Sequence, residues 1–287
     1  MFSIYKRELR SYFTGFMGYL FIAAMLLFVG IYVSIINLTN AYPTFEFTLY
    51  NLDYLYLIII PIVTMRIFAE DRRRHTAELL YSLPLRLSSI VLGKYLALLT
   101  VLAIPCAFYC IFPVLFSLYG NVDMLTSYSS IFAFFLMGAA LLAIGMFLSS
   151  LTESQLIAAV LSFGAVLLSY LMAGLALYIP SSAYASLFCF IIFILLMAVL
   201  IRFLTKSTFF AACCAIAAEL LLAIVFACKS SLFEGLFAKF LSALSVYARY
   251  ENFMAGLFDL TGVVYYLSVI ALFLFFSTLS LEKRRWS

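Results

Sequence analysis

The sequence predicts an all-α membrane protein, a polytopic bundle of about eight transmembrane helices. Hydrophobic residues make up 67% of the 287 residues and charged residues only 10%, whereas a soluble domain averages about 45–50% and about 25%. This much apolar surface exceeds what a soluble fold of this length can bury, so a large part of it must face lipid. The apolar runs are long and lack the alternation of a membrane β-barrel, which favours helices.

The first 15 residues mix aromatic and aliphatic side chains with four charged ones, Lys6, Arg7, Glu8 and Arg10. This pattern is typical of a helix that lies in the membrane interface with its cations toward the lipid headgroups. A plain basic flank that only orients the first span explains the same composition, and the residues alone do not separate the two interpretations.

Eight apolar runs are long enough to cross the hydrocarbon core, which takes about 20 helical residues. The second is the weakest, because Asp53 and Arg66 lie near its ends and must reach toward the interfaces. Small residues such as Gly138 and Gly145 allow close helix packing within the bundle. The predicted spans are Phe16–Leu38, Leu49–Ile67, Tyr95–Tyr119, Tyr128–Leu151, Ser154–Tyr178, Ala183–Ile201, Thr208–Cys228 and Leu260–Leu281.

The distribution of basic residues predicts the orientation. If all eight runs cross, fourteen of the 17 Lys and Arg residues lie on the side of the N-terminus. Cytoplasmic segments carry the excess of Lys and Arg. We therefore expect both termini in the cytoplasm, in a multi-pass protein of the cell membrane and most simply the bacterial plasma membrane. The cations form no stripe suited to nucleic acid, so no nucleic-acid partner is expected.

Residues 70–93 form the longest segment predicted on the cytoplasmic side. Leu79, Leu80 and Leu83 predict the apolar edge of a short helix that ends before Pro84, since the residue before proline disfavours helix. Ser88 or Ser89 would then cap the next helix. A short amphipathic helix between two spans favours docking to a partner. The alternative is a charged linker that obeys the positive-inside rule.

Residues 229–259 form a long segment predicted on the outer side. Ser231 and Glu234 have the S-x-x-E spacing of a capping box, and large apolar residues recur behind them at helical spacing. A second short helix is predicted over Tyr250–Phe258, and Asp259 would cap the last span. Both short helices are expected to lie on the outer leaflet or to dip into it.

One ionisable residue, Glu219, falls near the middle of a predicted span. A charged carboxylate there costs at least about 2.5 kcal/mol, so it needs a partner, water or a proton. It is either a proton or substrate contact, or a neutral glutamic acid bonded to a neighbouring helix. The chain has no G-x-x-x-x-G-K-[ST] motif, one histidine and no C-x-x-C pair, so we expect no ATPase activity and no metal site in this chain.

Three stretches, residues 1–15, 61–95 and 250–287, carry motifs that resemble the permease subunits of type-2 ATP-binding-cassette (ABC) exporters. The C-terminal stretch is most similar to the gliding-motility-type branch. The motifs are Lys6-Arg7-Glu8-Leu9, Met65-Arg66-Ile67-Phe68-Ala69-Glu70-Asp71, Thr76-x-Glu78-Leu79-Leu80, Leu83-Pro84, Gly93-Lys94, Phe253 to Gly256, Asp259-Leu260, Val264 to Ser268 and Leu281 to Trp286.

The resemblance implies one permease domain over residues 1–287, with an elbow helix at 1–15, a cytoplasmic coupling loop at 70–93 and an external helical segment at 229–259. It implies a dimer of two permease chains, identical or different, that binds two separate ABC ATPase subunits; ATP and magnesium belong to those subunits. Family members usually have six spans, so the extra pair at 183–228 departs from the pattern. The resemblance places the coupling contact on Glu70, Asp71, Arg72, Thr76, Glu78, Leu79, Leu80 and Pro84.

The expected function is therefore export of an amphiphilic, lipid-like or peptide substrate, driven by ATP hydrolysis in a partner. An ion-coupled secondary transporter is the main alternative, although Glu219 is its only support and no inverted repeat is evident. An intramembrane enzyme lacks a catalytic constellation. A membrane scaffold that transports nothing is the remaining possibility.

Overall fold

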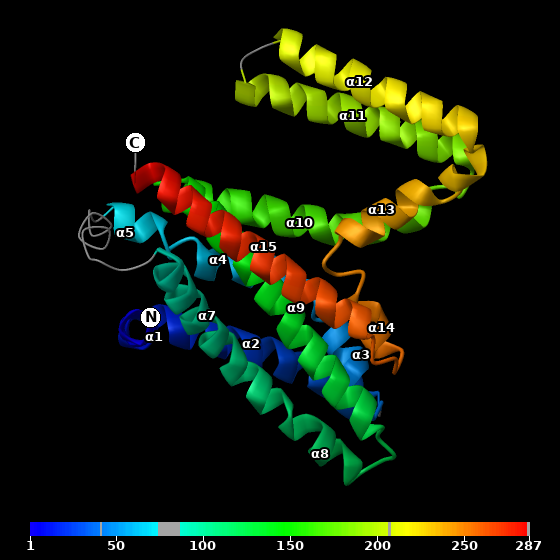
Figure 1. The fold of residues 1–287 in the computed structure, drawn as a ribbon. Helices are drawn as coiled ribbons and strands as arrows, with labels where there is room; N and C mark the ends of the chain where they lie inside the picture. The colour runs from blue at the N-terminus through cyan, green and yellow to red at the C-terminus, as the bar shows by residue number, and fades with distance from the viewer. Residues whose placement is uncertain (41, 74–86, 206–207, 286–287) are drawn as a thin grey trace. The chain divides into compact units, whose positions relative to one another are not determined.

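The computed structural model describes residues 1–40, 42–73, 87–205 and 208–285, and every regular element in these ranges is a helix (Figure 1). The predicted all-α class is thus confirmed for the part of the chain described. The chain divides into two compact units. Unit 1 comprises Met1–Tyr170 and Arg249–Ser287, and unit 2 comprises Leu171–Ala248.

Unit 1 is built around α9. In an apolar 18-residue stretch of α9, 72% of the residues are buried, whereas in the corresponding stretch of α15 only 17% are buried. A helix that is apolar on all sides belongs in the centre of a bundle, and Figure 1 shows α9 between α7, α4 and α15. The helices of unit 1 are α1 (Phe2–Thr14), α2 (Phe16–Tyr32) with its π-helical continuation η1 (Val33–Thr39), α3 (Phe45–Tyr50), α4 (Leu55–Thr64), α5 (Ala69–Arg73), α7 (Leu87–Tyr109), α8 (Ile111–Ser117), α9 (Met124–Leu151), the first part of α10 (Gln155–Tyr178), α14 (Tyr250–Met254) and α15 (Leu260–Arg285).

Two glycines of α9 let α4 approach closely, as predicted. A Cβ atom added at Gly138 would lie 2.7 Å from the hydroxyl of Tyr56, and one added at Gly145 would lie 2.5 Å from Oγ1 of Thr64. The Tyr56 hydroxyl uses this proximity to donate a hydrogen bond to the carbonyl of Phe134, at 3.1 Å. The contact holds α4 against the central helix of unit 1.

The predicted span Leu49–Ile67 is not a single helix. It comprises the end of α3, a turn at residues 51–54 that contains Asp53, and α4. The side chain of Asn51 donates to the carbonyl of Phe47 at 2.8 Å and so satisfies the end of α3. The ten residues of α4 extend about 15 Å, half the thickness of a hydrocarbon core.

Five helical stretches in the described residues are long and apolar enough to cross a membrane, or six if one bent pair counts as a span. The chain is therefore an integral membrane protein, although the predicted number of eight spans is not confirmed. The five are Phe16–Thr39, Leu87–Ser117, Met124–Leu151, Gln155–Tyr178 and Leu260–Lys283, the bent pair is Ala212–Cys228 with Ser230–Leu244, and Ala183–Val199 is a shorter apolar helix.

The helix ends differ in part from the sequence prediction. Asp259 caps α15 as predicted, because its Oδ1 accepts the backbone N–H of Thr261 at 2.9 Å. The prediction that Ser88 or Ser89 caps the third span was wrong, since α7 already includes both residues. An N-cap residue lies just before the first helical residue, so a serine inside the helix does not occupy that position.

The predicted capping box of the external segment was also wrong. Ser231 lies in the short 3₁₀ helix η2 (Ser230–Phe233), and α13 (Leu236–Leu244) begins only after Gly235. Gly235 has φ +65°, a left-handed conformation that glycine adopts easily. This turn separates Ser231 from the helix it was expected to cap.

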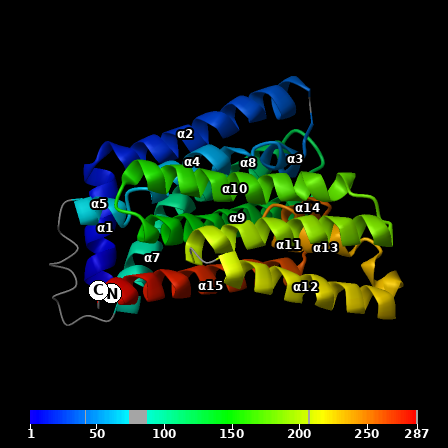
Figure 2. The ribbon, with the colours of Figure 1, turned by 90° about the horizontal axis from the view of Figure 1, so that it is seen from above.

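Unit 2 is a helical hairpin braced by aromatic side chains. Helices α11 (Ala183–Thr205) and α12 (Thr208–Cys228) pack side by side, as Figures 1 and 2 both show. Helix α13 packs on α11, where the rings of Phe237 and Phe190 meet edge-on with centroids 4.9 Å apart. Phe237 belongs to a small buried cluster that includes Met172, from the last part of α10, and Leu241.

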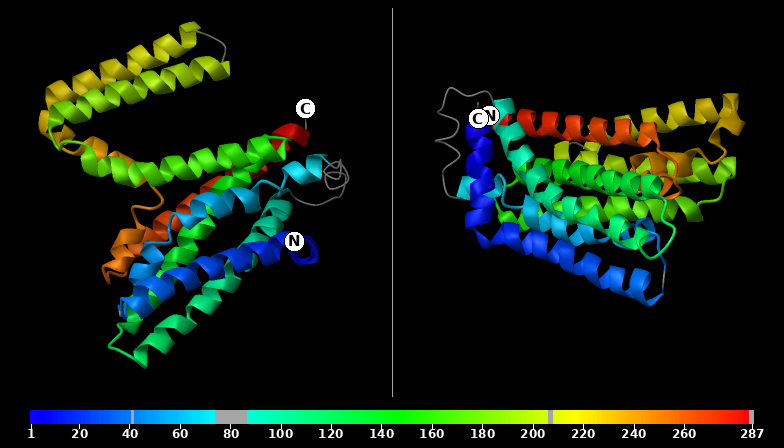
Figure 3. Two further views of the ribbon diagram at one scale, coloured as in Figure 1. Left: turned by 180° about the vertical axis from the view of Figure 1, so that it is seen from behind. Right: turned by 90° about the horizontal axis from the view of Figure 1, so that it is seen from below.

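The first and last helices of unit 1 meet α5 at one end of the unit. The start of α1 and the end of α15 lie at the end where α5 is found, in the views of Figures 1, 2 and 3. Ser280 near the end of α15 donates to the carbonyl of Ser150 at 3.3 Å, and Ser149 contacts Phe68, which directly precedes α5. We call this the α5 end of unit 1.

Candidate functional site

Helix α1 lies against the beginning of α7 at the α5 end. A Cβ atom added at Gly93 would lie 3.2 Å from the side chain of Ile4, so the absence of a side chain at residue 93 permits the contact. Tyr5 follows Ile4 directly on α1, and its hydroxyl is hydrogen-bonded at 3.0 Å to that of Thr100, about two turns beyond Gly93 on α7. The N-terminal helix is therefore attached to the bundle along its length, which a plain flanking segment would not require.

The side chain of Lys94 is the centre of this end of the unit. Its Nζ lies 3.0 Å from Oε1 of Glu8, 2.6 Å from Oδ2 of Asp71 and 2.9 Å from the carbonyl oxygen of Ile67. A lysine ammonium has three N–H donors, and here each finds an acceptor. The Lys94 side chain is 2% exposed. A charge buried to this extent is stable only when it is paired and hydrogen-bonded.

These contacts connect three helices that are distant in sequence. Glu8 belongs to α1, Asp71 to α5 and Lys94 to α7. Asp71 and Lys94 lie on either side of residues 74–86, which are outside the described part of the chain. Both flanks of that segment are thus held together by one ion-paired group, which we call the Lys94 node and define as Lys94, Glu8, Asp71 and the Ile67 carbonyl.

Further polar contacts surround the node. Arg7 donates to Oε1 of Glu8 at 2.7 Å, and Arg66 binds both carboxylate oxygens of Glu70, at 2.8 and 3.1 Å. The ring of Phe68 lies 5.5 Å from Lys94 Nζ, within the range of a cation–π contact. Each carboxylate named here therefore has at least one cation beside it, so the cluster is electrostatically compensated.

The central helix α9 supports the segment that carries Ile67. The hydroxyl of Ser149 accepts the backbone N–H of Phe68 and donates to the carbonyl of Met65, both at 3.3 Å. From α1, the hydroxyl of Tyr12 donates to the carbonyl of Val63 at 3.4 Å. Burial, with a smaller contribution from Glu8, raises the pKa of Tyr12, so this phenol keeps the proton that it donates.

The structure places part of the predicted coupling contact at the node. Asp71 is a member of it, Glu70 is next to it, and Arg72 lies in α5. The other predicted contact residues, namely Thr76, Glu78, Leu79, Leu80 and Pro84, lie outside the described residues. The described part of the predicted coupling contact thus lies in α5, which the node attaches to α7.

The charged residues of the N-terminal helix divide into two groups. Lys6, Arg7 and Arg10 are exposed, as an interfacial helix requires, whereas Glu8 is half-buried and turned toward α7. Sequence reasoning grouped Glu8 with the exposed charges and did not single out Lys94. The signal was present, because a lysine between Gly93 and Tyr95 in an otherwise apolar helix needs a buried anionic partner.

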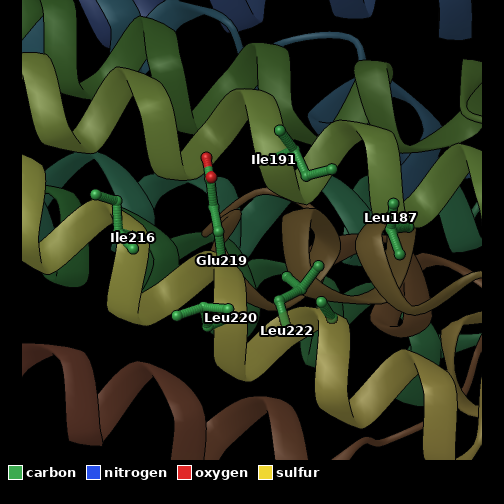
Figure 4. A pocket seen from close by; sticks show the side chains of 7 residues that line it. Leu187, Ile191, Ile216, Glu219, Leu220 and Leu222 are labelled. Atoms are coloured by element: carbon green, nitrogen blue, oxygen red, sulfur yellow. The ribbon is translucent and has the colours of Figure 1, made fainter.

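Glu219 belongs to a different feature, in unit 2. It is half-buried near the midpoint of α12 and lines an open, mainly apolar pocket between α11 and α12 (Figure 4). Within the described residues, no group of three or more His, Cys, Asp and Glu side chains is arranged to hold a metal ion.

No protein-family model matches the chain, and no curated protein matches its sequence.

Proposed function

We propose that this chain is the transmembrane permease subunit of an ABC transporter. In this proposal it forms a substrate pathway with a second permease chain, the same or different, and is driven by separate ABC ATPase subunits that hold ATP and magnesium. The transported substrate is an amphiphilic, lipid-like or peptide molecule moved outward. The motif resemblance supports this class, and the five or six apolar helices supply the membrane domain that it needs.

The observation that carries the proposal is the Lys94 node. A subunit without its own ATPase motif must receive mechanical work through a surface segment attached rigidly to its spans. Residues 70–93 have that property at both flanks, since Asp71 and Lys94 are joined at 2.6 Å in a buried setting. A displacement imposed on the segment would pass directly to α7 and, through Ile67 and the Met65–Phe68 contacts with Ser149, to α4 and α9.

The same contacts give the N-terminal helix a role. Because Glu8 shares the Lys94 ammonium with Asp71, α1 cannot separate from α7 without leaving a buried charge partly unpaired. We propose that α1 lies along the cytoplasmic interface with Lys6, Arg7 and Arg10 toward anionic lipid headgroups, in the bacterial plasma membrane, and that both chain termini are cytoplasmic.

The test of the proposal is co-purification with a candidate ABC ATPase subunit from the same cell. Full-length protein is co-expressed with that ATPase and isolated through a tag on the permease. The double variant Glu78→Arg with Leu79→Asp should lose the ATPase and the ATP-dependent transport, while its size-exclusion profile stays that of the wild type. The matched control, Glu282→Arg with Leu279→Asp at the end of α15, changes charge and hydrophobicity in the same way and should retain both.

Retention of the ATPase and of transport by the Glu78 and Leu79 double variant would contradict the assignment of the coupling segment. The ion-coupled alternative is tested with the purified chain reconstituted in proteoliposomes. Transport that proceeds on a proton gradient without ATP, and that Glu219→Gln abolishes, would identify a secondary transporter. A chain that binds the ATPase but supports no transport of any amphiphile would identify a scaffold.

A further inference from the structure

The pocket between α11 and α12 has a composition that selects one kind of ligand. It has a volume of about 390 Å³, within the range of about 300–1,000 Å³ typical of sites for small organic molecules. Leu187 and Ile191 line it from α11, and Ile216, Leu220 and Leu222 from α12. Among the described lining residues, Glu219 alone is ionisable, and Figure 4 shows its side chain pointing from α12 toward α11.

The carboxyl group of Glu219 has no hydrogen bond or ion pair with any residue that the structure describes. The described cations of unit 2 lie far from its level. Lys229 follows Glu219 by ten residues, about 15 Å along a helix axis, Arg202 follows Ile191 on α11 by eleven, and Lys239 lies on α13. A carboxylate among apolar side chains needs a partner, water or a proton, and an organic cation is a partner that no described residue of the site supplies.

Aromatic rings join the two helices beside the pocket. Tyr184 and Phe226 have ring centroids 5.6 Å apart and lie one helical turn from Leu187 and Ala223 respectively. Phe226 also packs edge-on against Phe233, at 5.2 Å. This aromatic contact joins α11, α12 and η2, which keeps the hairpin together beside the pocket and preforms it.

We propose that this pocket binds a hydrophobic amine, with the ammonium group on the Glu219 carboxylate and the hydrocarbon part against the leucine and isoleucine side chains. An ammonium–carboxylate contact is a charge-assisted hydrogen bond, roughly twice as strong as a neutral one. A second copy of the chain fits less well, because the described middle of its own hairpin offers no cation at this level. A neutral lipid tail fills the apolar part of the pocket but leaves the carboxyl group without a partner.

The test is equilibrium binding of tritiated N,N-dimethyldodecylamine to the full-length protein in lipid nanodiscs, corrected with empty nanodiscs. Glu219→Gln should weaken binding at least about tenfold, the loss expected for one charge-assisted contact. Ala223→Phe, which fills the pocket, should also remove binding. The matched controls, Glu234→Gln outside the pocket and Ala218→Phe on the same helix but not in the lining, should bind as the wild type does.

Competition by unlabelled 1-dodecanol distinguishes the contribution of the ammonium charge from that of the hydrocarbon tail. It should compete at least about tenfold less well than the unlabelled amine. Equal competition by the alcohol, amine affinity of Glu219→Gln within about twofold of the wild type, or wild-type binding no greater than that of empty nanodiscs would each overturn the proposal. Loss of a dimer in Glu219→Gln without amine binding would assign the pocket to a second copy and would overturn it too. The assay uses neither ATP nor a partner, so its outcome is independent of the proposed permease function.

Discussion

Replacing Lys94 with methionine removes three N–H donors while keeping a side chain of similar length. Glu8 and Asp71 then lose the cation that they share, and the Ile67 carbonyl loses its donor. Removal of one partner from a buried ion pair costs about 3–5 kcal/mol. The side chains of Glu8 and Asp71 are 16% and 26% exposed, so water compensates in part. We therefore expect the low end of the range, about 3 kcal/mol.

The loss should appear locally, as detachment of α1 from α7. Hydrogen–deuterium exchange of the full-length protein in nanodiscs reports the free energy of that opening. A cost of about 3 kcal/mol corresponds to exchange roughly 150-fold faster in the amides of residues 5–14. The control Lys283→Met removes an exposed lysine near the end of α15 and should leave the exchange of α1 unchanged.

A triple variant separates the destabilisation caused by unpaired carboxylates from that caused by lost packing of the Lys94 side chain. Adding Glu8→Gln and Asp71→Asn to Lys94→Met leaves no uncompensated carboxylate, so exchange in α1 should return part of the way toward the wild-type rate. Exchange within about threefold of the wild type in Lys94→Met alone would refute the reasoning, because the node would then not hold α1 in place.

Three further comparisons by thermal unfolding test a close helix contact, a buried hydroxyl group and a helix cap. Gly145→Ala should destabilise the protein by about 1–3 kcal/mol through overpacking against α4. The control Gly164→Ala places its new methyl group in open space and should be neutral or stabilising by up to about 1 kcal/mol. Equal effects of the two substitutions would contradict the close approach of α4 to α9 at Gly145. Tyr250→Phe should stabilise the protein, since the Tyr250 hydroxyl is buried without a hydrogen-bond partner in the described chain. Tyr109→Phe loses a 3.1 Å hydrogen bond and should destabilise the protein by about 1 kcal/mol. A less stable Tyr250→Phe than Tyr109→Phe would contradict these hydrogen-bond assignments. The pKa of Asp259, the cap of α15, is held below its usual range, chiefly by the hydrogen bond that the Asn252 side chain donates to its carboxylate. The stabilisation that the Asp259 carboxylate contributes is therefore complete above its unfolded-state pKa, near 4, and fades as the pH falls through its lowered folded-state pKa. The Tm difference between Asp259→Ala and the wild type should then shrink below about pH 4. A Tm difference that stays constant with pH would show that the charge of Asp259 does not contribute.

Composition and hydropathy predict the long helices because burial in lipid leaves few alternatives to them. The spans that begin near Phe16, Tyr128, Ser154 and Leu260 appear as helices with nearly the expected bounds. The break between α3 and α4 was not predicted, because hydropathy averages over the turn around Asp53 and does not register that Asn51 closes α3. Caps were predicted with mixed success, since a serine or aspartate at suitable spacing fits a helix start or the middle of a turn.

The sequence singled out the segment beside the Lys94 node but not the central residue of the node. The segment from Glu70 onward was singled out from charge and from the resemblance, and Asp71 does lie at the node. Lys94 was named in the Gly93-Lys94 motif and counted as a cytoplasmic cation, but not as an ion-pair centre, because a sequence does not show which distant carboxylates will meet a given lysine. Its partners are 86 and 23 positions away, and their meeting depends on the packing of α1 at Gly93.

Site-specific photo-crosslinking tests the central claim most directly. A photoreactive phenylalanine derivative replaces Leu79 in the full-length chain, co-expressed with the proposed ABC ATPase partner, and replaces Tyr119 as the control. Tyr119 is 91% exposed and follows α8, at the end of unit 1 away from α5 (Figure 1). We expect a covalent adduct with the ATPase from position 79 and none from position 119. An intact complex in which position 79 gives no adduct, or in which position 119 gives as much, would contradict the assignment of residues 70–93 as the coupling segment.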